Sequence, residues 1–329
     1  MLKLVTTWPL GRPFRGCLGL ACQGLAAYPC GSKSQAFHAM TPVEKFLLLT
    51  FTPLLLVTSF IEAWVLSRRQ SYDWRAMGVS VVDLFGRLFF SYGVPLSLAG
   101  GLTHWAHDHR LMQLSLNSWQ TFLVLFFGQE FCYYWYHRAA HRVRWFWCNH
   151  AVHHSPNNLN LATAYRIGMF GKLTGTFLFF TPLVWLGFEP RLVLVTLTIN
   201  LLYQFWIHTT WVPKLGWMEG IFNTPSAHRV HHASNLHYID ANYGGVLVIF
   251  DRMFGTYVPE RADLPPRYGL VTPLYSNNPL YVEFHQWIAL GRDLRQARSL
   301  RALLGHLFMP PGWQPGAAAQ TEPQGKVRA

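Results

Sequence analysis

Residues 137–154 read HRAAHRVRWFWCNHAVHH and form the densest group of chemically active side chains in the chain. The stretch holds five histidines, arranged as HRAAH at 137–141 and HAVHH at 150–154. Residues three or four apart lie on one face of an α-helix, so each of these boxes presents its imidazoles in one direction. We therefore expect two helical segments that aim several histidines at a common point.

A third box, HRVHH, spans residues 228–232. With 16 histidines in 329 residues, chance gives about 0.04 boxes of the form H-x-x-H-H, whereas this chain has two. A single histidine on an apolar face is usually a packed core residue, but three helical boxes together indicate a metal site. The box histidines are His137, His141, His150, His153, His154, His228, His231 and His232.

Eight imidazoles exceed what one ion binds, so the boxes predict two metal ions. Neutral imidazole is a ligand for iron, zinc, copper and nickel. His208, at the end of an apolar helix, and His237, five residues beyond the third box, are candidates to complete the two ligand shells. Glu130 precedes His137 by seven residues on the same helical face, which makes it a candidate catalytic group.

Ligand histidines need partners that fix their tautomers. Several polar residues close to the boxes could serve, although each could equally be a solvated loop position. These candidates are Asn149, Asn157, Asn160, Asn235, Asp240 and Asn242.

The composition is typical of a membrane protein, because 51% of the residues are hydrophobic and 13% are charged, against about 25% charged in soluble domains. Four stretches are apolar over about the 20 residues that a bilayer requires. They are 46–66, 84–103, 118–136 and the longer 169–207. We predict an all-α integral membrane protein with about four to five transmembrane or membrane-embedded helices and a cytoplasmic, histidine-rich helical cap that holds a dimetal site.

The formal net charge is +12, which a nucleic-acid-binding protein could also show. Here the arginines flank apolar spans as cytoplasmic anchors, so we exclude nucleic acid as a partner. Arg68 and Arg69 place the end of the first span in the cytoplasm. The run 169–208 reads as a helical hairpin interrupted by GFEP at 187–190, which would return the chain to the same face. All three boxes would then emerge on the cytoplasmic side.

Other polar residues near the spans receive structural interpretations. Asp83 and Arg87, four residues apart, are predicted to pair, with a functional role as the alternative. The three histidines 104, 107 and 109 are predicted to lie at the opposite membrane interface, although a separate metal site there is the alternative. The five cysteines form no C-x-x-C pair and are predicted to be unpaired thiols of a reducing compartment.

The predicted domain organisation has three parts. Residues 1–39 read as a leader or upstream extension, residues 40–310 as one membrane-bound domain with its histidine-box region at about 120–260, and residues 311–329 as a disordered tail. Within the domain, residues 282–309 form a helix-like, basic and moderately amphipathic segment that favours association with anionic lipid.

The boxes, together with QFWIHTTW at 204–211, NTPSAHRVHH at 223–232 and NYGGVLVIFDRMFGTY at 242–257, resemble the membrane-bound fatty acid hydroxylase and sterol desaturase superfamily. The resemblance covers about 120–260 and is strongest to its alkylglycerol monooxygenase members. It implies a di-iron centre on the cytosolic face that uses O2 to attack a C–H bond of a membrane lipid. It also implies that the eight box histidines are the core ligands, and it supports His208 more than His237.

The electron donor stays open. The chain has no G-x-G-x-x-G after a strand for a dinucleotide and no HPGG of the kind that cytochrome b5 carries. Electrons must then come from a separate protein or a diffusible reductant: cytochrome b5, ferredoxin or tetrahydropterin. The alkylglycerol monooxygenases are longer and use tetrahydropterin, but a shorter chain need not share that donor.

We therefore predict an O2-dependent di-iron oxidoreductase of the bacterial inner membrane or endoplasmic reticulum that hydroxylates or desaturates a lipid. Sterols, ether lipids, fatty acyl chains and aminolipids such as ornithine lipid are all candidate substrates. The alternative is a membrane metal-binding or transport protein that uses the histidines for zinc or copper. A transport path would place ligands within the spans, whereas these boxes lie at helix ends.

Overall fold

The computed structural model of the chain describes residues 42–69, 72–94 and 96–316. Within these ranges every regular element is a helix, and β-pairing is limited to isolated bridges. The predicted all-α class is therefore confirmed for the described part of the chain. The predicted leader, and all of the predicted tail beyond residue 316, lie outside the described residues.

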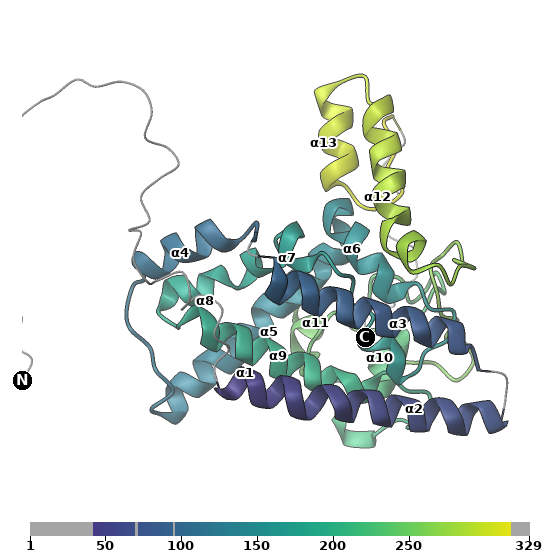
Figure 1. Cartoon of the computed structure of the whole chain (residues 1–329), viewed down its shortest axis with the longest axis horizontal. Helices are drawn as coiled ribbons and strands as arrows, with labels where there is room; N and C mark the ends of the chain where they lie inside the picture. Colours follow the sequence, from purple (N-terminus) through teal and green to yellow (C-terminus); the bar gives the residue numbers. More distant parts are fainter. Residues whose placement is uncertain (1–41, 70–71, 95, 317–329) are drawn as a thin grey trace, which may run out of the picture. The chain divides into compact units, whose positions relative to one another are not determined.

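Figure 1 shows the order of the elements along the chain. The first half contains α1 (Pro42–Phe46), η1 (Leu47–Phe51), α2 (Thr52–Arg69), α3 (Trp74–Leu88), η2 (Phe89–Gly93), α4 (Gly100–Asp108), α5 (Trp119–Arg142) and α6 (Arg144–His154). The second half contains η3 (Leu161–Thr163), α7 (Gly171–Thr174), η4 (Thr176–Phe180), α8 (Thr181–Leu186), α9 (Pro190–Ile207), η5 (Gly216–Met218), α10 (Pro225–His231), α11 (Ile249–Met253), α12 (Pro279–Gln296) and α13 (Leu300–Phe308).

Two helices in the described ranges are long and apolar enough to cross a bilayer. The first joins α1, η1 and α2 into the 28-residue helix Pro42–Arg69, and the second is the 18-residue α9. In the most apolar window of each helix only 17% and 28% of the residues are buried, so the other residues are at least partly exposed. The predicted first span, 46–66, lies inside Pro42–Arg69.

The predicted second span, 84–103, does not form one helix. The helix of α3 and η2 runs instead over residues 74–93, and Val94 is extended, with φ −105° and ψ 115°. A proline at position 95 of the sequence explains this end, because the residue before a proline is disfavoured in a helix. The apolar run that follows is divided between a loop and α4.

The predicted hairpin over 169–208 has one regular arm. Its second half is α9, but its first half is broken into α7, η4 and α8. The break falls at Gly175, which has φ +93° and whose missing Cβ would lie 2.9 Å from the side chain of Leu178 and 3.0 Å from that of Leu98. The apolar helix Thr176–Leu186 is then only about 16 Å long at about 1.5 Å per residue, which is too short to cross a bilayer core.

The predicted Asp83–Arg87 pair is also absent from the described residues. Asp83 is turned toward the loop after η3, where its Oδ2 accepts hydrogen bonds from the backbone N–H groups of Ile167 (2.8 Å) and Gly168 (3.3 Å). No ion pair within 4 Å joins it to Arg87, whose buried Nε has no hydrogen-bond partner in this part of the chain. The carboxylate thus organises a loop, and its charge acts on the nearby arginine without a direct ion pair.

The main apolar core lies among α5, α8 and α9. Leu125 and Cys132 of α5 pack with Leu183 and Val184 of α8 and with Val193 of α9. Fully burying side chains of this size stabilises a protein by about 1.5–3 kcal/mol each. The core fixes the carboxyl-terminal ends of α5 and α9 relative to each other, and these ends carry His137, His141 and His208.

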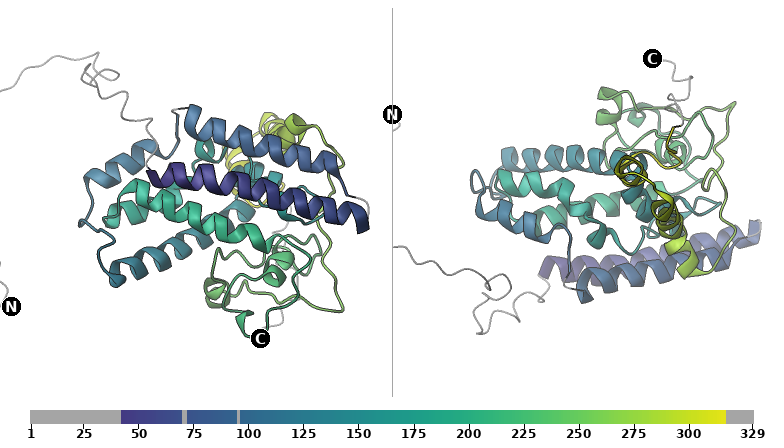
Figure 2. Two further views of the ribbon diagram at one scale, coloured as in Figure 1. Left: turned by 60° about the horizontal axis from the view of Figure 1, so that its bottom comes forward. Right: turned by 90° about the horizontal axis from the view of Figure 1, so that it is seen from above.

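The predicted single segment 282–309 is divided into α12 and α13. Ser299 begins the second helix, because its side chain accepts a hydrogen bond from the backbone N–H of Ala302 (3.1 Å). In Figure 1 this pair stands apart from the remaining helices and lies across the direction of α2. In the right-hand view of Figure 2, α13 is seen nearly end-on and α12 obliquely, while α2 runs across the picture.

Candidate metal centre

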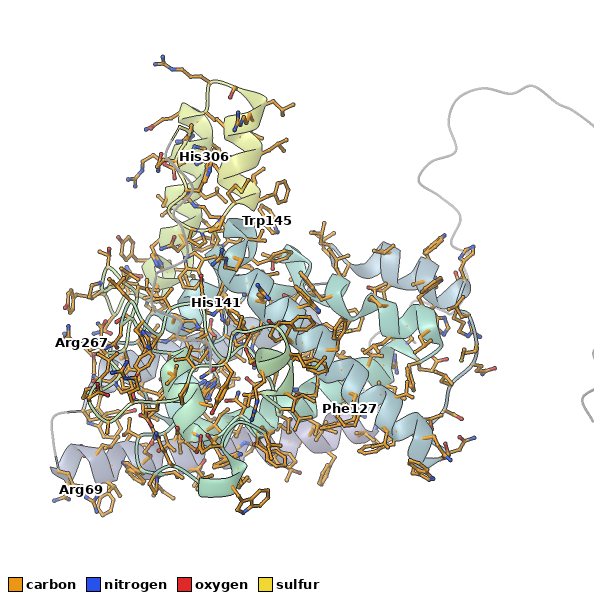
Figure 3. The ribbon with its side chains drawn as sticks, turned by 180° about the vertical axis from the view of Figure 1, so that it is seen from behind. Arg69, Phe127, His141, Trp145, Arg267 and His306 are labelled. Carbon is orange, nitrogen blue, oxygen red and sulfur yellow. The ribbon has the colours of Figure 1, made fainter. Side chains whose placement is uncertain are left out.

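Nine of the ten predicted ligand histidines converge on two buried groups. We call the first the five-histidine group; it consists of His137, His141, His150, His154 and His231. We call the second the four-histidine group; it consists of His153, His208, His228 and His232. In each group one nitrogen per residue lies within 4.8 Å of the corresponding nitrogen of every other member. Figure 3 marks His141 among the side chains of the interior.

Helix geometry explains how three boxes make two groups. In α6, His150 and His154 are four residues apart and join the five-histidine group, while His153 turns to the other group. The third box does the reverse, since His228 and His232 join the four-histidine group and His231 joins the first. The first box, on α5, then completes one group, and His208, at the end of α9, completes the other.

The nitrogen separations match the shell of a single ion. In the four-histidine group, the Nε2 of His208 lies 2.9 Å from that of His228, 3.2 Å from that of His232 and 3.3 Å from that of His153. In the five-histidine group, the Nε2 atoms of His137 and His150 are 3.1 Å apart. Ligands about 2.1 Å from one ion lie about 3.0 Å apart when adjacent in an octahedron and about 3.4 Å apart in a tetrahedron.

Backbone carbonyls fix the tautomers of four histidines. The Nδ1 atoms of these residues lie 2.7–3.0 Å from carbonyl oxygens: His137 from Tyr243, His153 from Arg166, His208 from Gln204 and His231 from Ala241. A carbonyl can only accept, so each Nδ1 must carry the proton. Each Nε2 therefore presents a lone pair toward its group, as a metal-ligating histidine requires.

Burial keeps these side chains neutral. It lowers the pKa of eight of the nine histidines below the ordinary value, and for His153 to about 4. The Nε2 atoms of His141, His154 and His231 are also buried without a hydrogen-bond partner among the described residues. An unsatisfied buried polar atom is costly, and a cation bound by these lone pairs would remove that cost.

The carbonyls of Ala241 and Tyr243 belong to a loop that buried carboxylates hold in place. Asp251 accepts hydrogen bonds from the backbone N–H groups of Tyr243 (2.7 Å) and Gly244 (2.8 Å) and from the hydroxyl of Thr256 (2.7 Å). Burial raises the pKa of Asp251 to about 6, although these hydrogen bonds act to lower it. The sequence pattern singled out this residue only as part of a matching motif.

Glu130 also holds this loop in place. Its Oε2 accepts from the backbone N–H groups of Val246 and Leu247, both at 2.8 Å, and its Oε1 accepts from the side chain of Asn200. It makes no hydrogen bond to a histidine among the described residues. The prediction that it points at whatever His137 binds is therefore wrong: its oxygens are occupied by the loop and by α9.

A second loop supplies the carbonyl of Arg166. Its backbone N–H groups are bound by Asp83, as described above, and by Asn149, whose Oδ1 accepts from Phe170 (2.9 Å). The buried guanidinium of Arg166 donates to the hydroxyls of Ser80 (3.0 Å) and Ser155 (3.1 Å). Side chains of α3 and of the end of α6 therefore fix the Arg166 carbonyl that binds His153.

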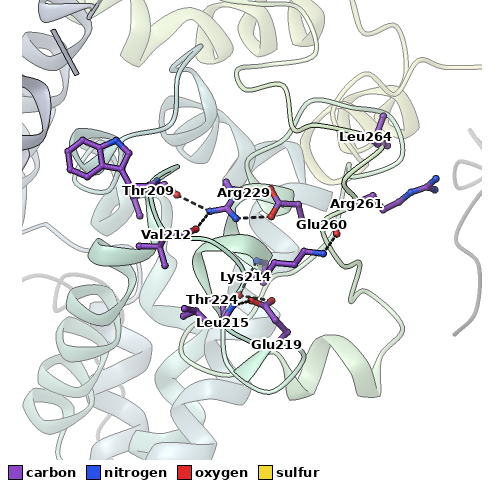
Figure 4. Close-up of polar contacts among 12 residues, drawn as sticks. Thr209, Val212, Lys214, Leu215, Glu219, Thr224, Arg229, Glu260, Arg261 and Leu264 are labelled. Atoms are coloured by element: carbon purple, nitrogen blue, oxygen red, sulfur yellow. Dashed lines mark hydrogen bonds and ion pairs between the residues drawn. The ribbon is translucent and has the colours of Figure 1, made fainter. Parts of the chain in front are cut away.

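A buried ion pair joins the segment after His208 to α10 (Figure 4). Arg229 donates to both carboxylate oxygens of Glu260, at 2.8 and 2.7 Å, and to the carbonyls of Thr209 (3.2 Å) and Val212 (2.8 Å). Such a two-pronged contact restricts both position and orientation. It connects His208 with the helix that carries His228 and His232.

The structure does not bring His237 to either group. It lies beyond the end of α10, where its half-buried ring contacts Tyr238, with a centroid separation of 5.7 Å. The turn that follows, with Asp240 at φ 60° and Asn242 at φ 57°, returns the chain to the site only at residues 240–243. His237 is therefore left outside both ligand sets.

The histidines predicted at the opposite interface stay outside the groups as well. The Nε2 of His107 lies 3.1 Å from the carboxylate of Glu189, and His109 stacks on Trp105 with a centroid separation of 4.7 Å. Their position at a membrane interface stays a prediction.

Of the predicted supporting polar residues, Asp240 alone contacts a group histidine, because its Oδ1 lies 3.7 Å from the Nδ1 of His141. The asparagines hold loops instead. Asn149 binds the carbonyl of Ile167 after η3, and Asn160 binds Thr163 of η3 itself. Asn157, Asn235 and Asn242 bind backbone groups of more distant segments. Cys132 and Cys148 are buried free thiols, as predicted; the other three cysteines lie outside the described residues.

The fold and the site thus define a helical protein with two adjacent, buried histidine groups suited to metal ions. Comparison with known proteins agrees: residues 122–256 match the family model described as fatty acid hydroxylase. Over this region the chain resembles the fatty acid hydroxylase superfamily. No solved structure matches it.

Several curated proteins are similar to the chain. It is 40% identical over 210 residues to alkylglycerol monooxygenase of Xenopus tropicalis, covering 64% of this chain and 46% of that protein. It is 36% identical over 266 residues to the human enzyme of that name, covering 80% and 58%. It is 33% identical over 128 residues to an ornithine lipid hydroxylase of Rhizobium tropici, covering 39% of each. The chain spans about half the length of the alkylglycerol monooxygenases it matches.

Proposed function

We propose that this chain is an integral-membrane, O2-dependent di-iron oxidoreductase that hydroxylates or desaturates a membrane lipid. One observation carries the proposal. The Nε2 atoms of His153 and His208 lie 3.3 Å apart, yet both Nδ1 protons are committed to carbonyls, so two lone pairs face each other. A metal cation between the two nitrogens would bind both lone pairs and so remove their repulsion.

The two groups divide the ligands between two ions. His137, His141, His150, His154 and His231 would hold one, and His153, His208, His228 and His232 would hold the other. Zinc has no redox chemistry, whereas imidazole-bound iron does, and the similarity to the hydroxylase superfamily favours iron. When bound, the iron pair would supply the redox chemistry that activates O2.

The protein's own residues prepare this centre in three ways. Burial excludes bulk water and keeps the imidazoles neutral, so that their lone pairs are available without loss of protons. The carbonyls of Tyr243, Ala241, Arg166 and Gln204 hold four rings in the orientation that ligation requires. Ring centroids of His154 and His232 are 4.5 Å apart, so the two ligand groups lie side by side.

The substrate we favour is a lipid with an alkyl chain on a glycerol or amine-bearing polar head. The similar proteins are named alkylglycerol monooxygenase and ornithine lipid hydroxylase, and both names describe oxidation of such a lipid. We place ether lipid first, since more of this chain matches those relatives. Electrons would come from a separate donor, either cytochrome b5, ferredoxin or tetrahydropterin, and the site would face the cytoplasm.

Lipid mass spectrometry tests the proposal. Cells that express the full chain should accumulate a lipid, or its breakdown product, that has gained one oxygen or lost two hydrogens, and cells that express His153→Ala should not. Identical lipid profiles, with both proteins present in the membrane at equal amounts, would contradict the proposed activity. So would full activity of protein that contains zinc alone.

Zinc or copper transport explains the geometry less well. The group histidines all lie outside the two candidate spans, Pro42–Arg69 and Pro190–Ile207, with His208 just beyond the second. A transport path needs ligands within the membrane. Metal uptake by vesicles that contain the pure protein would favour this alternative over the oxidoreductase.

A further inference from the structure

The helical pair α12–α13 is tied firmly to the helix that carries the second histidine box. Arg144, the first residue of α6, forms an ion pair with Asp293 of α12 (2.6 Å), and its backbone N–H donates to the carbonyl of Met309 (3.2 Å). The rings of Trp145 and Trp287 meet edge to face, with centroids 5.1 Å apart. Whatever holds this pair therefore also positions α6.

Both helices leave apolar residues uncovered at helical spacing. In α12 these are Leu280, Phe284 and Ile288, which are 67%, 40% and 50% exposed. In α13 they are Leu300, Leu304 and Phe308, which are 71%, 44% and 58% exposed. Residues that recur every four positions form a continuous stripe on a helix. Single exposed apolar residues are ordinary, but two such stripes on one helical pair indicate a surface that something covers.

The charges beside these stripes are nearly all positive. Four exposed arginines lie within ten residues at the junction of the two helices: Arg292, Arg295, Arg298 and Arg301. The acidic residues of α12 do not offset them, because Asp293 is paired with Arg144 and Glu283 is buried. A basic, apolar surface of this kind complements an anionic lipid surface.

The apolar surface continues onto the long helices. Phe284 contacts Phe170 (centroids 5.3 Å apart), and Phe170 contacts Phe90 beside the exposed Phe89. Because α12 and α13 lie across the direction of α2, a bilayer crossed by α2 would have the pair lying along its plane (Figures 1 and 2).

We infer that α12 and α13 form an interfacial anchor, which inserts its apolar stripes into the anionic leaflet of the membrane and places its four arginines at the phosphate level. The anchor fixes the depth of α6, and with it His150, His153 and His154, relative to the lipid. It does not depend on the metal or on the reaction.

Site-directed spin labelling tests the anchor. The full chain, with its native cysteines replaced, is labelled at Leu300→Cys and, as a matched control, at Leu236→Cys, an equally exposed leucine (70%) flanked by the polar residues Asn235 and His237. Each protein is placed in nanodiscs of neutral lipid or of neutral lipid with anionic phosphatidylglycerol. Collision of the label with O2, which concentrates in lipid, is compared with collision with a water-soluble nickel chelate.

The label at position 300 should be accessible to O2 and protected from nickel, more strongly with anionic lipid, while the label at 236 remains accessible to nickel. Replacing the four arginines by glutamine should remove the effect of anionic lipid. Nickel access at position 300 in both lipids would overturn the inference. Protection from both reagents would also overturn it, since a second protein surface would then cover the stripe.

Discussion

The imidazoles of His153 and His208 show why single residues matter at this site. Their Nε2 atoms meet at 3.3 Å with no proton to share, and each ring is held in that state by a carbonyl behind it. Neither ring can rotate to relieve the contact without losing a buried hydrogen bond. The protein has thus built an arrangement that only a cation satisfies.

Replacing His153 by alanine should remove metal from the four-histidine group and abolish activity, because the ion there loses one of its four ligands. The protein should still insert into the membrane, since the main core among α5, α8 and α9 is untouched. Metal analysis and lipid assays of the purified variant check this. The control is His107→Ala, which removes a half-exposed contact to Glu189 and should change neither; an equal loss there would contradict the assignment.

His232 and His237 form a second matched pair, five residues apart. His232→Ala should lower the bound metal to about half, whereas His237→Ala should leave the metal content unchanged, because that ring lies beside Tyr238 and outside both groups. Metal-to-protein ratios of the two variants distinguish them. Loss of metal in His237→Ala alone would show that the ligand sets are drawn wrongly.

For single residues, the sequence indicates which histidines come together but not how they divide between the two groups. The spacing of HAVHH and HRVHH predicts histidines on one helical face, yet the split between His153 and its neighbours depends on how α6 and α10 face each other. The carbonyls of Tyr243 and Arg166 leave no trace in the sequence, because any residue type supplies a carbonyl. The position of Glu130 misled for a related reason: helical periodicity shows the side of a helix, not what packs there.

At the scale of elements, the loop at 240–247 is as necessary as the helices. Asp251 binds two of its backbone N–H groups and the hydroxyl of Thr256, while Glu130 binds two more. This loop carries the carbonyls that orient His137 and His231. A substitution of a carboxylate that holds this loop should therefore disturb the five-histidine group although no ligand is changed.

Asp251→Asn should reduce the stability of the fold by about 1–3 kcal/mol, because an amide has one acceptor oxygen where the carboxylate offers two and a buried N–H loses its partner. Metal in the five-histidine group should also bind more weakly. Chemical denaturation and metal titration of the purified protein measure the two effects. Asp263→Asn, which alters an exposed ion pair with Arg261, is the control and should change neither; equal behaviour of the two variants would contradict the role of the loop.

Hydropathy located the apolar stretches but not the helix ends. The second stretch contains the end of a helix at Gly93, and the first arm of the hairpin breaks at Gly175, which has φ +93°. A sliding window averages over such positions, although a proline at 95 and a glycine at 175 are visible in the sequence. The division of 282–309 at Ser299 could likewise be found from its capping side chain.

At the scale of the whole molecule, the buried histidines should make the metal-free fold sensitive to acid. An unfolded chain protonates histidine below about pH 6.5, whereas burial holds the pKa of His153 at about 4 and lowers that of seven other group members. Between these values the unfolded state binds more protons, so stability falls as the pH falls. Asp251, Glu130 and Glu283 act in the opposite direction, because burial raises the pKa of each of these carboxyls, but they are outnumbered by the eight histidines.

The melting temperature of metal-free protein in detergent should therefore be lower at pH 5.5 than at pH 7.5. The slope is up to about 1.4 kcal/mol per pH unit for each histidine that stays neutral. The variant His153→Ala, with one such group fewer, should show a smaller difference. An unchanged or higher melting temperature at pH 5.5 would mean that the histidines are not buried as neutral side chains.

The all-helical class followed from composition and from helical spacing, and the structure agrees over the described residues. Among the described residues, two helices meet the requirements of length and apolarity, and the expected total of four to five membrane-embedded helices stays a prediction. Apolar side chains that pack on one another and those that face lipid look alike in a sequence. What places α5 and α8 in the core is their mutual contact through Leu125 and Leu183.

The central claim is that nine histidines hold two iron ions in separate sets of five and four. The most direct test is the metal content of the purified full chain, measured per polypeptide by elemental analysis after expression with iron supplied. We expect about two iron ions per chain in the unaltered protein and about one in His232→Ala. A single ion per chain, or two zinc ions in protein that is fully active, would contradict the claim.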